Sequence, residues 1–182
     1  MKQSIVYLAV LVTLLFSSLA HANTLAFDKQ MQPILNVYLN IPKALAADKT
    51  DGVLSAAKAI GKLAEKLDVS KVTGMHAKHY KNIPATIKAA AKKLAAAKDI
   101  TAMREALKAL SKPLAMWATM SKPKGVSVMY CSMSSGSWLQ KNNTVIFNPY
   151  YGTKMLHCGE IVGGEGSTVN KVQDNNHNRQ TH

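Results

Sequence analysis

The chain has 182 residues, with 23 lysines and arginines against 10 acidic residues and a net charge of +13. At this length a single domain is the default expectation. Two cysteines are too few for a disulfide-rich scaffold, a four-cysteine zinc site or an iron–sulfur cluster. The alanine-rich apolar fraction favours close-packed helices over a large enzyme cleft.

Residues 1–22 have the pattern of a secretory signal peptide. Lys2 precedes the apolar run of residues 5–16, and residues 20–22 (Ala-His-Ala) form a small-x-small cleavage site. This run is short for a membrane span. We therefore expect a mature chain that starts at residue 23, has no transmembrane segment after cleavage and resides in a bacterial periplasm. Export to that compartment also argues against a nucleic acid as partner.

Residues 23–125 contain four amphipathic patterns in which apolar residues recur at steps of three and four. The patterns lie at residues 31–45, 53–67, 83–97 and 103–117. Short connections favour antiparallel neighbours, so we expect a mainly α fold built on an up-down four-helix bundle. Asn82 is a candidate N-cap of the third helix, and Asp99 or Thr101 of the fourth. Pro42 and Pro113 predict kinks in the first and fourth.

The positive charge is concentrated on this helical part. Residues 43–124 hold 17 lysines and arginines against 6 acids, whereas residues 126–162 carry a net charge of only +1. A solvated helix surface is the simplest explanation. The alternative is weak attraction to an anionic surface such as lipid headgroups, polysaccharide or an acidic protein.

Residues 126–162 form an alanine-free segment of β-formers and turn residues. We expect it to be a small irregular or β cap that packs on the bundle within the same domain. The expected strands are residues 126–130, 144–147 and 155–158, and the expected turns are residues 134–137, 141–143 and 148–149. Residues 163–182 have no apolar period, which predicts a disordered tail.

Soft metal ligands are concentrated in this cap. They are Met129, Cys131, Met133, Met155, His157 and Cys158. Alternation along an extended strand places Met129, Cys131 and Met133 on one face. Thiolate, thioether and imidazole groups select Cu(I) and related soft ions. The cap has one acid, Glu160, so a calcium or magnesium site is a poor fit.

The same two cysteines also suit a disulfide. They lie 27 positions apart, and in an oxidising compartment a bond between them would add about 3–4 kcal/mol of stability. Residue types alone leave the metal pair and the disulfide evenly matched. Trp138 and Tyr150-Tyr151 either shield a metal site or form the core of the cap, and the core is the favoured interpretation.

Four stretches of the chain carry a family resemblance. They are Met129-Tyr130-Cys131-Ser132-Met133, Ser137-Trp138-Leu139-Gln140, Asn148-Pro149-Tyr150-Tyr151-Gly152 and Lys154-Met155-Leu156-His157-Cys158-Gly159-Glu160, with Arg104-Glu105-Ala106-Leu107 in the last helix. Together they resemble the domain of unknown function 3347 family. The resemblance runs from about Phe27 to Val162; it is strong in the C-terminal motif and loose in the helices.

Domains of that family occur alone in exported bacterial proteins or fused to periplasmic adaptor subunits of heavy-metal efflux pumps. The resemblance therefore implies a helical bundle with an appended motif, and copper or another soft metal. The ligands that it nominates are Cys131, Met133, Met155 and Cys158. Ser132 stands where the family usually has proline, and His157 is not a family hallmark.

We therefore expect an exported chaperone or buffer for Cu(I) in heavy-metal resistance or efflux, with an efflux adaptor or another envelope protein as partner. The alternative is a structural or interaction module in which Cys131 and Cys158 form a disulfide and the bundle docks on an envelope partner. We expect no enzymatic activity, because no serine-histidine-acid set, metalloprotease motif or phosphate-cradling loop is recognisable.

Overall fold

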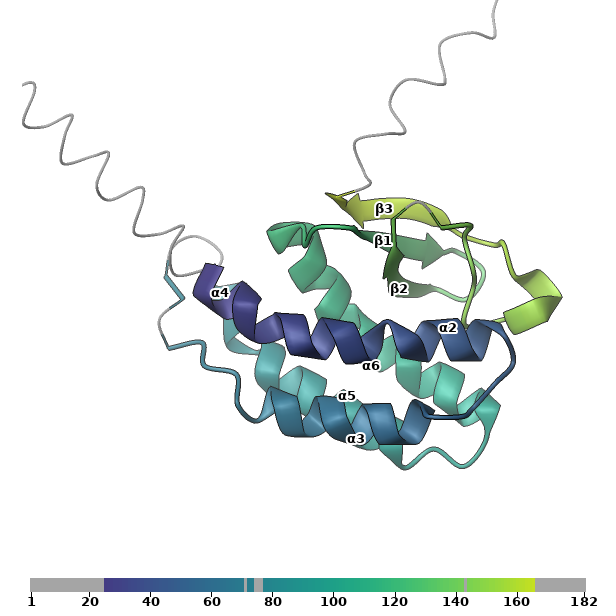
Figure 1. Cartoon of the computed structure of the whole chain (residues 1–182), viewed down its shortest axis with the longest axis horizontal. Coiled ribbons are helices and arrows are strands. Elements are labelled where there is room, and N and C mark those ends of the chain that lie inside the picture. The colour runs from purple at the N-terminus through teal and green to yellow at the C-terminus, as the bar shows by residue number, and fades with distance from the viewer. Residues whose placement is uncertain (1–24, 71, 74–76, 143, 166–182) are drawn as a thin grey trace, which may run out of the picture.

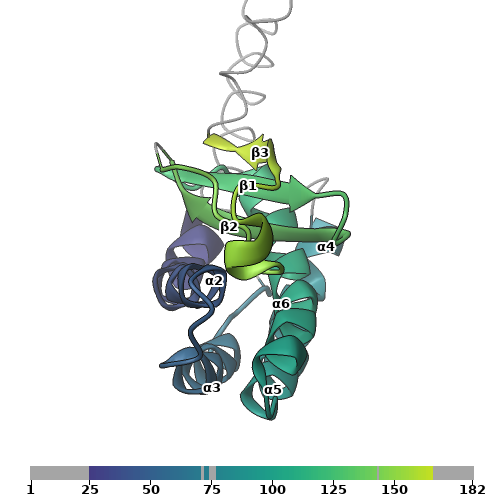
Figure 2. The same ribbon diagram turned by 90° about the vertical axis from the view of Figure 1, so that its right-hand side faces the viewer.

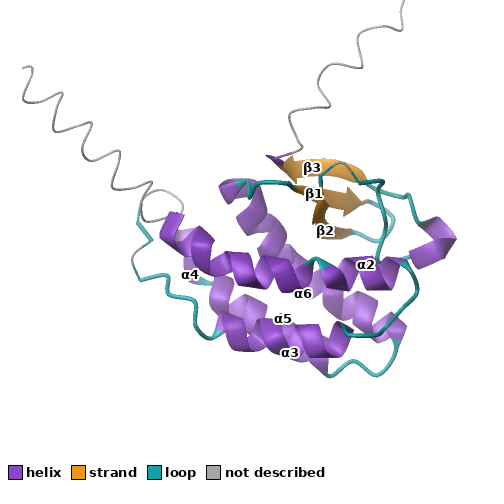
Figure 3. Cartoon of the chain, viewed as in Figure 1, coloured by secondary structure: helices purple, strands orange, loops and turns teal. Residues whose placement is uncertain are grey.

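The computed structural model describes residues 25–70, 72–73, 77–142 and 144–165. The chain is mainly helical, and its strands form one small antiparallel sheet in the C-terminal third (Figure 3). The expected signal peptide, residues 1–22, and most of the expected tail lie outside the described residues. Within the described part, no helix combines the length and the apolar character that crossing a bilayer requires.

The helices and strands follow one another with the helices first. Residues 25–38 are helical, and then come α2 (Asn40–Ala46), α3 (Val53–Ala64), α4 (Ala77–Lys81), α5 (Ile83–Ala95) and α6 (Ile100–Ser121). The strands are β1 (Val126–Cys131), β2 (Gly136–Lys141) and β3 (Glu160–Gly164), with the 3-10 helix η1 (Gly152–Met155) between β2 and β3 (Figure 1).

These elements stack in three layers. The sheet covers one side of a layer formed by residues 25–38, α2 and α6, while α3 and α5 lie on the far side (Figure 2). α3 and α5 are antiparallel, because Gly61 faces Ala91 and Glu65 pairs with Lys88. The helical part is consistent with the predicted four-helix bundle.

The first predicted helix is divided near its middle. Residues 25–38 are helical, Leu39 is a turn, and α2 begins at Asn40. Pro42 explains the break, because proline has no N–H to donate to the carbonyl of Tyr38 four residues earlier. α6, by contrast, runs without interruption through Pro113.

Of the residues predicted as N-caps, Asp99 is the one that caps a helix, and Thr101 lies inside α6. The carboxylate of Asp99 accepts a hydrogen bond from the backbone N of Ala102 at 2.8 Å, so it caps α6. Asn82 does precede α5, but its side chain makes no capping hydrogen bond. Pro84 lies in the first turn of α5, where its missing N–H costs little.

The strand predictions agree with the structure only in part. The strand predicted at residues 126–130 is β1, but residues 144–147 are irregular and residues 155–158 form the end of η1 and a turn. The sheet order is β2-β1-β3 with both pairs antiparallel. β3 also includes Gly163 and Gly164, so the cap extends beyond the boundary predicted at residue 162.

β2 was missed because it lacks an alternating pattern. Its residues Trp138 and Leu139 are both fully buried, although neighbouring strand residues point to opposite faces. Leu139 shares a face with its partner Val128. This face is turned toward the bundle, because a Cβ at Gly163 would meet both Val128 and Thr119 of α6. A strand that is covered on both faces no longer shows the apolar–polar alternation that sequence reasoning needs.

A buried polar contact joins the bundle to the sheet. The hydroxyl of Tyr38 lies 2.6 Å from Ser111 Oγ on α6 and accepts the hydrogen bond from β2. Burial raises the pKa of Tyr38 to about 12, against the opposing effect of these hydrogen bonds. The phenol therefore stays neutral at physiological pH and holds three elements at one point.

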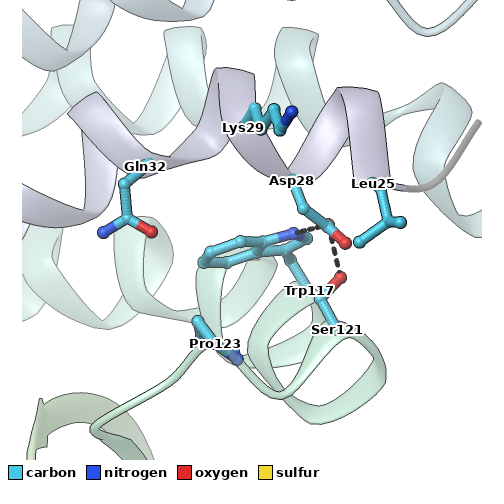
Figure 4. A pocket seen from close by; sticks show the side chains of 7 residues that line it. All are labelled: Leu25, Asp28, Lys29, Gln32, Trp117, Ser121 and Pro123. Atoms are coloured by element: carbon cyan, nitrogen blue, oxygen red, sulfur yellow. Dashed lines mark hydrogen bonds between the residues drawn. The ribbon is translucent and has the colours of Figure 1, made fainter. Parts of the chain in front are cut away.

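Asp28 ties the first helix to the end of α6 (Figure 4). Its Oδ1 accepts hydrogen bonds from Trp117 Nε1 at 2.7 Å and from Ser121 Oγ at 2.6 Å. Ser121 Oγ also lies 2.9 Å from the hydroxyl of Tyr80. Asp28, Trp117 and Ser121 border a groove of about 410 Å³, within which Trp117 is only 1% exposed.

Replacing Asp28 by alanine should lower the free energy of unfolding by about 1–3 kcal/mol, because the buried indole N–H of Trp117 loses its acceptor. Urea denaturation followed by Trp fluorescence measures the change. Asp28→Asn is the matched control, since its amide oxygen can still accept both hydrogen bonds. Equal losses in the two variants would contradict the role assigned to Oδ1.

Candidate sulfur site

The structure brings the two cysteines together. Cys131 ends β1, Cys158 lies between η1 and β3, and their Sγ atoms are 2.9 Å apart. Neither forms a disulfide. Cys131 is 1% exposed, whereas Cys158 is half-buried. The pair therefore consists of one thiol inside the cap and one at its edge.

The pleat of β1 determines which side of the sheet holds the sulfur. Met129 and Cys131 share a face by alternation, and their partners on β2 are Trp138 and Gly136. Val128 points the opposite way, toward the bundle. The sulfur site is thus on the face of the sheet turned away from the helices.

Residues 144–159 fold over this outer face. Their approach depends on Gly136, where a Cβ atom would lie 2.5 Å from a ring carbon of Tyr150. It depends also on Gly159, where a Cβ would lie 2.6 Å from the Trp138 ring. The two rings meet edge to face with centroids 5.9 Å apart. Trp138 and Tyr150 are therefore core residues of the cap, as the favoured interpretation of the sequence had it.

Asn148 organises the folded-over segment. Its side chain is fully buried, and its Nδ2 donates to the carbonyl of Cys158 at 2.7 Å. Its Oδ1 accepts hydrogen bonds from the backbone N of Tyr150 at 2.8 Å and of Tyr151 at 3.3 Å. Its own backbone N donates to the carbonyl of Leu156 at 2.6 Å. One buried amide thereby closes the loop that delivers Cys158 to the sheet.

Arg104 on α6 attaches this segment to the bundle. Its guanidinium donates to the carbonyl of Pro149 at 3.0 Å and to the carbonyl of Leu45 at 2.8 Å, and it forms an ion pair with Asp48 at 2.5 Å. The Arg104 side chain is only 16% exposed. The guanidinium therefore joins the end of α2, the turn after it and the entrance to η1.

Asp48 completes the attachment from the other side. Its Oδ2 accepts hydrogen bonds from the backbone N and from the hydroxyl of Thr153 in η1. These bonds, followed by the hydrogen bond from Arg104, lower the pKa of Asp48 to about 2. Gly152 has φ of 60°, and a Cβ there would lie 2.1 Å from Asp48 Oδ1, so the position requires glycine.

The pKa values of the two thiols move in opposite directions. Burial opposes ionisation of Cys131, but hydrogen bonds from Cys158, Ser134 and Asn148 outweigh it and lower the pKa of Cys131. The hydrogen bond that Cys158 makes to Cys131 raises the pKa of Cys158, and its burial adds to this. Cys131 is consequently the sulfur that ionises first, and the thiolate is the form that binds a metal or attacks a disulfide.

The predicted methionines are distributed around the pair. Met129 is 1% exposed and shares the face of Cys131. Met133 lies beyond the end of β1, in the turn to β2, and is 61% exposed, so the prediction that it continues the same strand face was wrong. Met155 is half-buried in η1, and its carbonyl accepts from the backbone N of Cys158 at 3.1 Å.

His157 is exposed, and one of its two ring nitrogens forms a hydrogen bond. Its Nδ1 lies 2.7 Å from the carbonyl oxygen of Ile146. A carbonyl only accepts, so Nδ1 carries the hydrogen and Nε2 keeps a lone pair in the neutral ring. Across the described residues no three or more His, Cys, Asp or Glu side chains gather as a metal cluster. The structure therefore unites the two cysteines but does not add His157 to them.

Sequence reasoning missed the residues that support the site. The sequence indicates Ser134 only as a turn residue and Asn148 only as a turn and motif residue, and it gives no role to Asp48. Asn148 precedes proline in a turn, which is a signal for an Asx-type hydrogen bond. No local signal identifies Asp48, because its partner Thr153 lies 105 positions away in the chain.

One comparison with known proteins gives a match. A family model described as "Protein of unknown function (DUF3347)" matches residues 34–124. No curated protein and no solved structure gives a match. The matched range covers most of the helical part and ends before β1, so both cysteines lie outside it, although the motifs around them carried most of the resemblance.

The hydroxyl of Ser134 donates to the carbonyl of Cys131 at 3.2 Å, close enough to the sulfur to favour its thiolate. Replacing Ser134 by alanine should therefore raise the pKa of Cys131. The pH dependence of iodoacetamide alkylation of Cys131, in a Cys158→Ser background, measures this pKa. Ser132→Ala is the matched control, since Ser132 is an exposed neighbour in the same turn. If both substitutions moved the alkylation profile equally, the Ser134 hydroxyl would have no specific role.

Asp48→Asn should destabilise the protein only where Asp48 is ionised. The folded-state pKa of about 2 lies below the usual value of about 3.9, so the carboxylate stabilises the fold above about pH 4. This contribution is lost as the pH falls through about 2. Denaturant unfolding should therefore separate Asp48→Asn from the wild type at pH 5 and bring the two together at pH 2. A gap that persists at the acid end would rule out the carboxylate as its cause.

Proposed function

The chain belongs to the protein family of unknown function DUF3347, and from this premise we propose that it is an exported soft-metal carrier. In this proposal it acts in the periplasm as a chaperone or buffer for Cu(I) in heavy-metal resistance or efflux. The observation on which the proposal depends is the sulfur pair, in which Cys131 Sγ and Cys158 Sγ lie 2.9 Å apart.

The chemistry of the donor set fits a soft ion. Two thiols with methionines nearby form a ligand set that selects Cu(I) over hard cations. The donors around Cys131 favour its thiolate, and the thiolate is the form that a metal requires. The cap has a single acid in residues 126–162, Glu160, and it is exposed, so oxygen ligands for a hard cation are scarce.

The distance between the sulfurs indicates that the pair must open to hold an ion. Two sulfurs on one tetrahedral ion, with bonds of about 2.3 Å, lie about 3.8 Å apart. The observed 2.9 Å is shorter. The side chain of Cys158 is the one with room to rotate, because Cys158 is half-buried, whereas Cys131 lies in the central strand and is 1% exposed.

The further ligands in this proposal are Met155, Met133, Met129 and His157. Met155 precedes Cys158 in the same turn, and the free Nε2 of His157 faces away from its bonded carbonyl. The half-buried edge of Cys158 is the side from which an ion enters and from which a periplasmic efflux adaptor would receive it. We also propose the up-down order of the four helices, in line with the antiparallel α3 and α5.

The 2.9 Å separation also favours a second candidate. A disulfide has sulfurs about 2.05 Å apart, so a small inward movement would join Cys131 to Cys158. In that case the protein is a structural or interaction module that docks on an envelope partner. The bond would link the central strand to the segment that Asn148 already holds, and metal would play no part.

Titration of Cu(I) against a competing chelator, with the protein fully reduced, tests the first candidate. We expect one tightly bound ion per chain, and loss of that binding in Cys131→Ser and in Cys158→Ser. Met116→Leu is the matched control, because Met116 lies on α6 and is 38% exposed. Absence of binding by the reduced wild type, or undiminished binding by Cys158→Ser, would refute the proposal.

Counting thiols in the protein as isolated from the periplasm separates the two candidates. The metal carrier should show two reactive thiols after chelation. The disulfide module should show none, and reductant should lower its melting temperature without any effect of Cu(I). The thiol count and the melting temperature are both measured on the same wild-type preparation, so no variant that might misfold is needed.

A further inference from the structure

A second cavity lies where the start of α2, the end of β2 and the segment of Thr144 and Phe147 meet. Its volume is about 170 Å³, and it is lined by Asn40 and Lys43 at the start of α2, by Gln140 and Lys141 at the end of β2, and by Phe147 of the connecting segment. Neither cysteine lines it, so its chemistry is independent of the sulfur pair and of any metal bound there.

The charge of this cavity is positive and uncompensated. Lys43 and Lys141 come from distant parts of the chain, yet both line the same small space. No acidic side chain lines it, and neither lysine forms an ion pair within the described residues. Residues 126–159 contain no Asp or Glu at all. Two ammonium groups beside one cavity favour a bound anion.

The polar floor of the cavity is already satisfied. Gln140 is 2% exposed, its Nε2 donates to Thr144 Oγ1 at 2.9 Å, and its Oε1 accepts from Trp138 Nε1 at 3.2 Å and from the backbone N of Phe147 at 3.3 Å. Gln140 is therefore fixed and needs no ligand. Asn40 donates one N–H of its side-chain amide to the carbonyl of Asn36 at 3.3 Å and has a second one. The donors left for a guest are therefore this amide and the two lysine ammonium groups.

The volume and the apolar walls of the cavity indicate what else the bound anion must contain besides its charged group. Leu39 and Phe147 supply apolar surface, and both are half-buried. An apolar cavity of about 150 Å³ admits one benzene ring, and this cavity is of similar volume, at about 170 Å³. A bare inorganic ion would leave the Leu39 and Phe147 side uncovered.

We propose that this cavity is a binding site for a small organic anion. Lys43 and Lys141 bind its carboxylate or phosphate group, and Leu39 and Phe147 contact an apolar body of about the size of one ring. Because the lysines are exposed at the rim, the attraction is screened by salt. The site is separate from the sulfur pair, although Phe147 directly precedes Asn148.

Calorimetric titration of the full mature chain with benzoate and with phenyl phosphate tests this proposal. We expect saturable binding of one probe per chain, weakened about tenfold by Lys43→Gln and by Lys141→Gln, since each removes one charged hydrogen-bond donor. Lys49→Gln and Lys122→Gln remove the same charge from positions that do not line the cavity. These control variants should bind like the wild type, and thermal melts should show all four folded.

Benzyl alcohol and inorganic phosphate test separately whether the site needs the charged group and the apolar ring of the bound anion. Both should bind far more weakly than benzoate, the first because it lacks the charge and the second because it lacks the ring. The Cys158→Ser variant should bind benzoate normally, whatever its affinity for Cu(I). Equal weakening by all four lysine substitutions, equal binding of benzyl alcohol, or no saturable binding at millimolar benzoate would each overturn the proposal.

Discussion

The buried amide of Asn148 holds the backbone at residues 150, 151 and 158 at once, and the position of Cys158 depends on it. Residues 144–159 contain no strand, so regular hydrogen bonding does not fix their path. A fully buried amide must find partners, because leaving one unpaired costs about 1–3 kcal/mol. This requirement gives an irregular segment one defined conformation over the outer face of the sheet.

The helical bundle provides the fixed base for that segment. Tyr38 and Ser111 anchor β2 to the helices, while Arg104 and Asp48 hold both ends of the turn that contains η1. The basic charge of the bundle is thus largely separate from the sulfur chemistry. Arg104 is the exception, since its positive charge has a structural task at the junction.

Sequence reasoning could locate the helices because each keeps a stripe of apolar residues over several turns. It could also name both cysteines, whose residue type already limits the chemistry. It could not find β2, since Trp138 and Leu139 are buried on opposite faces, nor the attachment by Asp48, whose partner is distant in the chain. The sequence also could not show that residues 144–147 are irregular, because Val145 and Ile146 are residue types typical of a strand. The backbone of this segment bonds to the buried side chain of Gln140, at Val145 O and Phe147 N, and not to a neighbouring strand.

Folding itself brings Cys131 and Cys158 together, before any metal or partner acts. The equilibrium of the dithiol with oxidised and reduced glutathione, measured in buffer and again in denaturing urea, tests it most directly. The native chain should form its intramolecular disulfide at a far lower proportion of oxidised glutathione than the unfolded chain does. The same midpoint in both conditions would contradict it, because the fold would then contribute nothing to the meeting of the two sulfurs.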